Sequence, residues 1–139
     1  MKALSLQQPW VYAILHAGKN VENRSWRTHY RGWIALHASA RPMPAAENVF
    51  PGQDSLPDVS TLPLSAICGV ARLVAIVSES RSEWFYRPED GSRNYGWVLE
   101  DVTPLPEPVP CKGALSLWEV PPDVVRAIRK QLPELDLNA

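Results

Sequence analysis

Four side chains with binding or catalytic potential lie close together near the N-terminus. The stretch GKNVENRSW (18–26) holds Lys19, Glu22, Arg24 and Trp26 around one aliphatic residue, Val21. If 20–27 is a β-strand, Glu22, Arg24 and Trp26 project from one face, because successive side chains alternate. A carboxylate and a guanidinium so placed can pair, and the pair would orient the guanidinium toward an anion or a base edge. The alternative is a solvent-exposed strand whose surface ion pair contributes less than ~1 kcal/mol.

The sequence indicates other candidate binding or catalytic residues less clearly. His37 lies in the strand-like stretch LHAS, where a lone histidine is more typical of a hydrogen-bonded core or rim residue than of a catalyst. Arg31 follows a turn, and it would either stabilise that turn or reach a phosphate. Trp97 is expected to pack in the core, although its flat face also suits stacking. The sequence has no GxSxG, HExxH or phosphate-loop pattern and no recognisable Ser/His/Asp arrangement.

Composition and charge narrow the class of protein. The chain has 139 residues, of which 45% are hydrophobic, and this indicates one soluble globular domain over 1–139. No apolar stretch reaches about 18 residues, so no membrane helix is expected. The N-terminus MKALSLQQPW does not resemble a signal peptide. A net charge of −1 argues against a protein that coats long nucleic acid, but it permits binding of one loop, one end or one nucleotide.

The two cysteines indicate packing and not metal binding. Cys68 and Cys111 lie far apart in the sequence without a CxxC pattern or a partner histidine. We therefore expect no metal and no cofactor. Reduced packing cysteines are typical of a cytoplasmic protein, which is the location we expect.

Prolines divide the chain into short elements. There are 14 prolines, and Pro9 suits the first turn of a helix that ends near Gly18. Pro121 and Pro122 open a C-terminal helix. Strands are expected at 3–6, 20–27, 33–39, 66–79, 95–102 and 114–120. With no βαβ rhythm, the pattern predicts a mainly β fold with helices (α+β), a small and mostly antiparallel β-barrel of five or six strands.

The remaining segments are expected to be connections. The Pro-rich stretch 40–65 is expected to be a mobile insertion loop with a short helix near 45–49. Residues 83–93 are expected to form a short helix or loop, and 104–113 (PLPEPVPCKG) to join two strands. Gly69 indicates a bulge or tight bend within its strand.

Three strings, taken in order, carry a family resemblance. They are ALSLQQPWVYAILHAGKNVENRSWRTHYRGWIALHAS, AICGVARLVAIV and YGWVLEDVTPLPEPVPCKGALSLWEV. Their central feature is the set Gly18, Lys19, Glu22 and Arg24, with QPW upstream and YRG downstream. Together they resemble the ASCH (activating signal cointegrator homology) domains of the PUA-like superfamily. The resemblance covers nearly the whole chain except 40–65 and the last helix.

This resemblance implies a PUA-like β-barrel in which the first helix and the neighbouring strand line a cleft. The side chains implied to line or adjoin the cleft are Lys19, Glu22, Arg24, Gln8, Arg31 and His37. The family resemblance also implies binding of RNA or a nucleotide-related ligand, and some members are hydrolases of acetylated cytidine or RNA. The QPW and YRG pattern is more similar to the cointegrator branch than to the compact amidohydrolases, so a full catalytic set is not carried over.

The first functional hypothesis is binding of RNA or a nucleotide-like small molecule. RNA-binding proteins commonly place Arg and Lys on the backbone and stack splayed bases on aromatic side chains. In this chain Lys19, Arg24 and Arg31 would meet phosphate. Trp26 or Trp97 would stack a base.

Two other hypotheses remain open from the sequence. In a hydrolase of modified nucleosides or RNA, Glu22 would be the general base on water, and Lys19 would stabilise developing negative charge. A nearby carboxylate favours the charged form of Lys19, which suits that electrostatic role. The third hypothesis is an adaptor that recruits a protein partner through 40–65.

Overall fold

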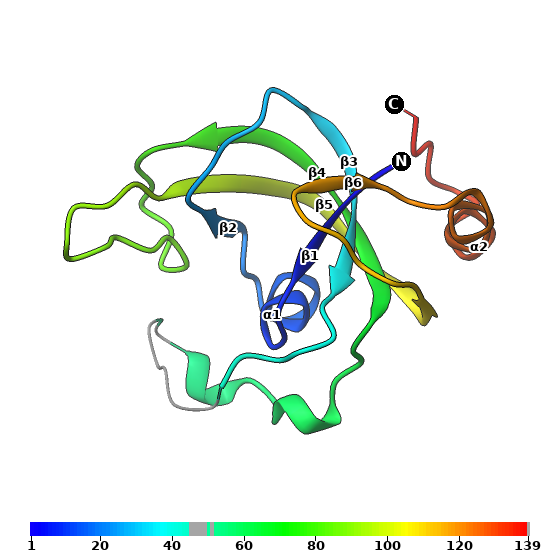
Figure 1. The fold of residues 1–139 in the computed structure, drawn as a ribbon, viewed down its shortest axis with the longest axis horizontal. Coiled ribbons are helices and arrows are strands. Elements are labelled where there is room, and N and C mark those ends of the chain that lie inside the picture. The colour runs from blue at the N-terminus through cyan, green and yellow to red at the C-terminus, as the bar shows by residue number, and fades with distance from the viewer. Residues whose placement is uncertain (45–49, 51, 139) are drawn as a thin grey trace.

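The computed structural model describes residues 1–44, 50 and 52–138, and over these residues one curled sheet wraps around a short helix (Figure 1). The elements, in order, are β1 (Lys2–Leu6), α1 (Trp10–His16), β2 (Val21–Arg24), β3 (Gly32–Ala38), η1 (Gln53–Ser55), η2 (Val59–Thr61), β4 (Ala66–Val77), β5 (Tyr95–Pro110), β6 (Leu117–Glu119) and α2 (Pro122–Gln131). The strand order in the sheet is β2-β5-β4-β3-β1-β6. The β1–β3 pair is parallel and the other pairs are antiparallel.

Both faces of the sheet are buried, and the two helices cover opposite faces. On β3, Trp33 and Ala35 pack in the cluster that contains Val124 and Ile128 of α2. Ile34, Leu36 and Ala38 point the other way and pack in the cluster with Val11 and Ile14 of α1. The two-residue period of the sequence therefore sorts side chains between two cores, because neighbouring strand positions face opposite sides.

The end of α1 sets the position of the chain that follows it. Gly18 has φ +77°, a conformation that glycine adopts without strain. The backbone N–H groups of Ala17 and Lys19 both donate to the carbonyl of Ala13, at 3.0 Å each. This turn stops the helix and directs residue 19 back toward the sheet, where β2 begins two residues later.

Gly69 allows α1 to lie close against the sheet. A Cβ atom placed there would be 2.5 Å from Cδ2 of Leu15 and 2.8 Å from the carbonyl oxygen of Thr103. The expected bulge is present, because the β4–β5 register shifts between Ile67 and Gly69. Gly69 thus serves both the irregular strand pairing and the approach of the helix that carries one cleft wall.

The expectation that 104–113 only joins two strands was wrong. Residues up to Pro110 belong to β5. Ile67 pairs with Val109 and Gly69 pairs with Pro104, so two steps along β4 correspond to five along β5. Much of the Pro-rich run therefore bulges out of the ladder, where a missing N–H removes no hydrogen bond between strands.

Other expectations differ from the structure mainly in extent. The strand expected at 20–27 is confined to β2, and the one expected at 114–120 to β6. Residues 83–93 form turns and irregular structure, which is the loop of the two alternatives expected there. The short helix expected near 45–49 lies outside the described residues. From residue 52 to 65 the segment forms the short 3-10 turns η1 and η2.

We predict that Gly69→Ala lowers the free energy of unfolding by about 1–3 kcal/mol, because the added methyl overpacks against Leu15 and Thr103. Chemical denaturation measures this change. In a Leu15→Ala chain, Gly69→Ala should lower the free energy of unfolding by less, because the closest contact of the added methyl is then removed. An unchanged free energy of unfolding in Gly69→Ala would contradict the close approach.

Candidate functional site

A buried ion cluster is formed by three of the side chains from the sequence motif. Lys19 Nζ lies 3.2 Å from Oε1 of Glu22, and Arg24 Nε lies 3.0 Å from Oε2 of the same carboxylate. Glu22 is 7% exposed and Lys19 is 2% exposed. Each carboxylate oxygen therefore has its own cation, and the cluster carries one net positive charge when all three groups are ionised. A solvated surface pair does not describe this site.

Burial controls the protonation behaviour of Lys19. Desolvation lowers its pKa, and it outweighs the opposing effect of the Glu22 carboxylate, while Arg24 lowers the pKa further. The sequence argument considered only the carboxylate, which favours the charged form. Nζ also donates to the carbonyl of Val21. The amine is thus held by two acceptors in a dry environment.

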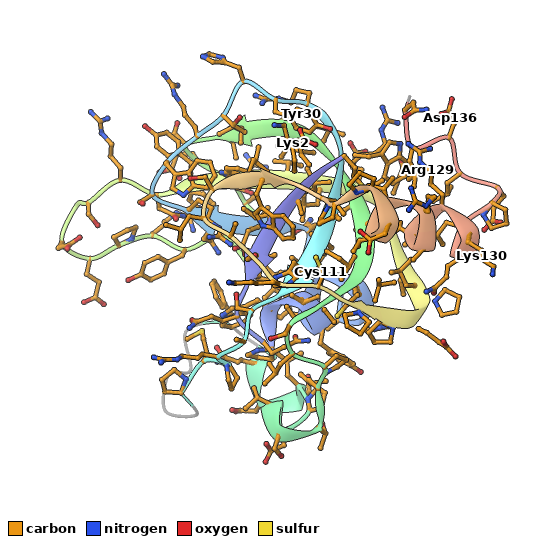
Figure 2. The ribbon with its side chains drawn as sticks, turned by 45° about the vertical axis from the view of Figure 1, so that its right-hand side comes forward. Lys2, Tyr30, Cys111, Arg129, Lys130 and Asp136 are labelled. Carbon is orange, nitrogen blue, oxygen red and sulfur yellow. The ribbon has the colours of Figure 1, made fainter. Side chains whose placement is uncertain are left out.

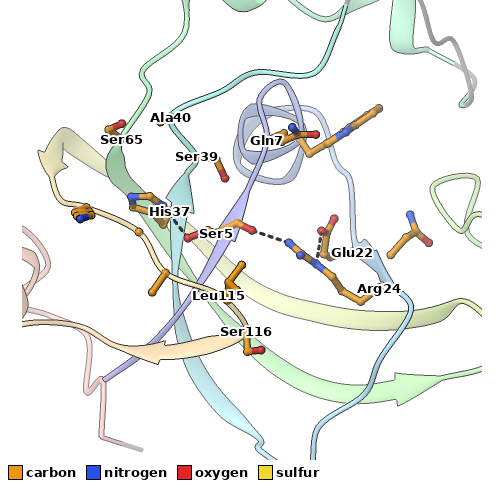
Figure 3. A pocket seen from close by; sticks show the side chains of 15 residues that line it. Ser5, Gln7, Glu22, Arg24, His37, Ser39, Ala40, Ser65, Leu115 and Ser116 are labelled. Atoms are coloured by element: carbon orange, nitrogen blue, oxygen red, sulfur yellow. Dashed lines mark hydrogen bonds and ion pairs between the residues drawn. The ribbon is translucent and has the colours of Figure 1, made fainter.

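Arg24 is fixed at both ends of its guanidinium group. Nε bonds Glu22, and Nη2 donates to the carbonyl of Ser5 at 2.8 Å. Its side chain is 23% exposed, so part of the group faces the adjoining cavity. Figure 3 shows Arg24 between Glu22 and Ser5, with His37 on the far side of Ser5. The arrangement orients the guanidinium at little further entropic cost to a ligand.

His37 acts as a structural link and is already satisfied by protein groups. Nε2 lies 2.7 Å from the carbonyl oxygen of Cys111, which can only accept, so Nε2 carries the proton. Nδ1 then accepts from the hydroxyl of Ser5 at 2.9 Å, and Trp118 Nε1 donates to that same oxygen. Burial lowers the pKa of His37, and the Cys111 bond acts in the opposite direction.

The loop after β5 lies directly on the His37 ring. A Cβ atom at Gly113 would be 2.5 Å from His37 Cε1 and 2.7 Å from Ser5 Oγ. Only glycine permits this approach without displacement. His37 therefore positions the segment 111–116, of which residues 112–116 line the cavity that Arg24 also lines.

The largest cavity beside this cluster, here called the main cleft, has a volume of about 790 Å³. Its charged lining residues are Glu22, Arg24 and Lys112, and the other side chains are polar or apolar. The complete lining is Ser5, Gln7, Trp10, Glu22, Asn23, Arg24, His37, Ser39, Ala40, Ser65, Lys112, Gly113, Ala114, Leu115 and Ser116. Leu115, which is 91% exposed, lies at its edge. The volume suits a small-molecule ligand.

A second cavity of about 300 Å³, here called the side cavity, adjoins the main cleft. It is lined by Trp10, Lys19, Glu22, Asn23, Met43, Phe50 and Tyr86. Trp10, Glu22 and Asn23 line both cavities. Lys19 lines only the side cavity of these two, so the motif divides between two compartments.

Four residues expected at the cleft lie elsewhere. Gln8 is buried, where its Nε2 donates to the carbonyl of Pro63 and its Oε1 accepts from the N–H of Tyr12. Gln8 therefore ties the Pro-rich segment to α1.

The two tryptophans considered for base stacking pack against each other, and Trp97 lies in the core, as its strand position predicted. Trp97 is 0% exposed, and its ring lies 4.8 Å from that of Trp26 in an edge-to-face arrangement. Trp97 Nε1 also donates to the carbonyl of Trp26. Neither residue lines the main cleft or the side cavity.

Arg31 stabilises the turn before β3. Its Nη1 donates to the carbonyls of Thr28 and Tyr30, both at 2.8 Å. It is exposed and lines neither cavity. Of the two roles considered from the sequence, the geometry supports the turn.

Sequence reasoning missed several residues of the site. Trp10 was assigned to the helix pattern alone, although it lines both cavities. Lys112 and Gly113 were read as part of a connection. The adjacent Lys112 and Gly113, in a connection between two strands, could have indicated a binding residue, because loops often carry such residues and glycine permits close backbone approach.

The described part of the chain has neither a cluster of metal-ligating side chains nor a helix that could span a membrane. Within residues 1–44, 50 and 52–138, no three His, Cys, Asp or Glu side chains gather closely enough to hold a metal ion. In the same residues, no helix has the length and hydropathy needed to cross a membrane.

Comparisons with known proteins agree on one family. The family model of the ASCH domain matches residues 4–106. Activating signal cointegrator 1 of Mus musculus is 24% identical over 140 residues, which cover 93% of this chain and only 24% of that protein. The crystal structure of ASCH from Zymomonas mobilis has a TM-score of 0.60 at 17% identity and covers 96% of this chain and 94% of that one. This structural likeness confirms the expected ASCH/PUA-like fold.

We predict that His37 makes the stability of the protein depend on pH. Its pKa is lowered in the folded state, so between that pKa and about 6.5 the unfolded chain binds more protons. The free energy of unfolding should therefore fall as pH is lowered through this window. Urea denaturation between pH 5 and 7 should show a flatter profile in His37→Gln.

The matched control is His29→Gln, because His29 is exposed. It should retain the wild-type profile. Identical pH profiles for wild type and His37→Gln would contradict the link between His37, Ser5 and Cys111.

Proposed function

Because the chain belongs to the ASCH domain family, we propose that it binds RNA or a nucleotide-like ligand in the main cleft. The observation that carries the proposal is the cluster in which Glu22 contacts both Lys19 and Arg24, and which has one net positive charge when all three groups are ionised. Arg24 faces the main cleft from this cluster, and Lys112 lines the same cleft. Two cations in one cleft suit a phosphate or another anion of the ligand.

The guanidinium of Arg24 keeps donors for such a ligand. Among the described residues, its hydrogen bonds use Nε and one hydrogen of Nη2. Nη1 and the second Nη2 hydrogen supply the further donors, and a guanidinium presents them in one plane. The fixed fork favours a phosphate that adopts one orientation.

The charge of the whole chain agrees with a short ligand. The formal net charge is −1, so no general attraction to a long polyanion is expected. Binding would depend on local cations in the cleft. This supports recognition of one loop, one end or one nucleotide, as the sequence argument also favoured.

A hydrolase function is a second candidate, favoured by the environment of Lys19. Burial lowers the pKa of this amine beside Glu22, and both groups line the side cavity. Glu22 would accept a proton from water, and Lys19 would stabilise negative charge on the substrate. Both Glu22 oxygens already accept hydrogen bonds from cations, so neither can take a proton from water without giving up one of these contacts. Binding is therefore the function that the geometry supports better.

The adaptor hypothesis stays a prediction with less support. The described part of the Pro-rich segment is attached to the fold through Gln8, which bonds Pro63, and through the N–H of Met43, which bonds the carbonyl of Gln8. Nothing in this packing specifies a protein partner. We rank it below the other two functions.

We predict that Arg24→Ala weakens the binding of a short single-stranded RNA by roughly tenfold, because a hydrogen bond to a charged group contributes about 1.5 kcal/mol or more. Lys112→Ala should weaken it less and reduce the slope of log affinity against log salt by about 0.7, the value for one phosphate contact on a single strand. Fluorescence anisotropy at several salt concentrations measures both effects.

Lys130→Ala is the control, because Figure 2 shows Lys130 on the outer side of α2, away from the cleft loop marked by Cys111. Its affinity and salt slope should match those of the wild type. RNA binding that is indifferent to both Arg24→Ala and Lys112→Ala would contradict the proposed function.

The hydrolase candidate predicts turnover that depends on Glu22. Wild-type protein would deacetylate acetylcytidine or cleave short RNA, and Glu22→Gln would be at least about 100-fold slower, because the general base is lost. Chromatography of the products measures this, with circular dichroism to confirm that the variant is folded. Intact substrates after incubation with both proteins would eliminate this candidate.

A further inference from the structure

The side cavity combines aromatic walls with an ionised floor. Trp10 and Phe50 lie edge to face with ring centroids 5.4 Å apart. Tyr86, which is 40% exposed, lines the same cavity. At the floor, Lys19 and Glu22 are paired at 3.2 Å. Flat apolar faces beside a donor and an acceptor match the two parts of a heterocyclic base, which are its faces and its polar edge.

The position of Tyr86 is linked to the strand that carries Glu22. The backbone N–H of Tyr86 donates to Oδ1 of Asn23 at 2.9 Å. Asn23 Nδ2 in turn donates to the carbonyl of Trp84 at 2.9 Å. The side chain of Asn23 is thus occupied in holding the segment 84–86 against β2. Asn23 positions an aromatic wall and is not itself a free ligand group.

Lys19 is directed toward the aromatic faces as well as toward its acceptors. Its Nζ lies 5.8 Å from the centroid of the Trp10 ring and 6.0 Å from that of Phe50. These distances are at the limit of cation–π attraction. Among the described residues, Lys19 Nζ donates to Val21 and Glu22, and a purely aliphatic ligand would offer no acceptor for the third hydrogen of the ammonium, which is costly in a buried site. The floor therefore selects a ligand with a polar edge.

The size and the connection of the cavity limit the ligand further. About 300 Å³ is at the lower end of ligand-site volumes, so the cavity has room for one base and not for a stack. Trp10, Glu22 and Asn23 form the boundary with the main cleft. Arg24 lies just beyond this boundary, bound to the same carboxylate as Lys19. A part of the ligand that extends out of the side cavity across this boundary therefore enters the main cleft beside Arg24.

We propose that the side cavity is the binding site for a single unpaired nucleobase, stacked on Tyr86 and Trp10 with its polar edge toward Lys19 and Glu22. The attached sugar and phosphate extend into the main cleft, to Arg24 and Lys112. The assignment of the phosphate rests on the proposed function, whereas the base site depends on the side cavity alone. The chain thus reads one flipped-out base of a single strand or one free nucleotide.

The test uses two fluorescent probes whose emission falls when the base stacks. One is the riboside of 2-aminopurine, which has no phosphate, and the other is a trinucleotide with 2-aminopurine at its centre. Wild-type protein should quench both in a saturable titration. Tyr86→Ala should weaken both affinities by roughly tenfold, because loss of one stacking aromatic has about this effect. Tyr86→Phe keeps the ring and should bind as the wild type does.

Two control variants separate stacking from other effects. Tyr12→Ala removes another partly exposed tyrosine, one that stacks on His16 at 4.9 Å and lines neither cavity, so it should leave both affinities unchanged. Lys112→Ala should weaken only the trinucleotide, because the riboside has no phosphate to contact it.

Different results would overturn the base site and the proposed function. Absence of riboside quenching, or riboside affinity that is equal in Tyr86→Ala and wild type, would overturn the base site. If neither Arg24→Ala nor Lys112→Ala changed the trinucleotide affinity, the proposed function would be overturned. The base site would still be upheld if riboside binding depended on Tyr86. Melting temperatures of all variants within a few degrees of the wild type would exclude unfolding as the cause.

Discussion

The burial of the Glu22 carboxylate between two cations is the interaction on which the rest of the site depends. An isolated carboxylate or ammonium group in a dry environment is very unfavourable, so Lys19, Glu22 and Arg24 must be held in register. Gly18 ends α1 and returns the chain so that Lys19 reaches Glu22. Apolar residues of similar size are often at least as stabilising as a buried ion pair. The presence of three ionisable groups at this buried position therefore agrees better with ligand binding than with stability alone.

A continuous set of contacts joins this cluster to the loop around Gly113 that lines the main cleft. Arg24 bonds the Ser5 carbonyl, the Ser5 hydroxyl bonds His37, and His37 bonds the Cys111 carbonyl. Gly113 then lies on the His37 ring. Both sides of the cleft are thus held by hydrogen bonds to one residue, Ser5 of β1, and β1 lies between β3 and β6 in the sheet. This arrangement fixes the cleft residues relative to one another, which would lower the entropic cost of binding for the proposed ligand.

The sequence predicted the general architecture well because local rules decide it. The two-residue period of 33–39, the proline at the start of each helix and the glycine after α1 all correspond to observed elements. The length of β5 was underestimated because its prolines argued against a strand. The bulge at Gly69 accommodates these prolines, and it depends on pairing between segments that are distant in the sequence. Tertiary context of this kind is invisible to a local pattern.

The site was predictable only in its central cluster. Three charged groups around one valine made Lys19, Glu22 and Arg24 candidates, but the spacing alone left a surface ion pair open, and the family resemblance implied their place in a cleft. The burial of Lys19, and hence its lowered pKa, depends on packing by Trp10 and Phe50, which no spacing reveals. His37 was expected to be a hydrogen-bonded core or rim residue, but the partners of Gln8 and His37 could not be predicted, since Pro63 and Cys111 lie 55 and 74 residues away in the sequence.

Mapping of a bound ligand by nuclear magnetic resonance tests the central claim most directly. A short single-stranded RNA is titrated into labelled protein, and shifts are followed for backbone amides and for the Nε–H of Arg24. The account predicts that the largest changes fall on Arg24, on Asn23 and on the loop around Gly113, with α2 unaffected. Changes confined to α2 or to residues 52–65, with Arg24 and Gly113 unmoved, would contradict it.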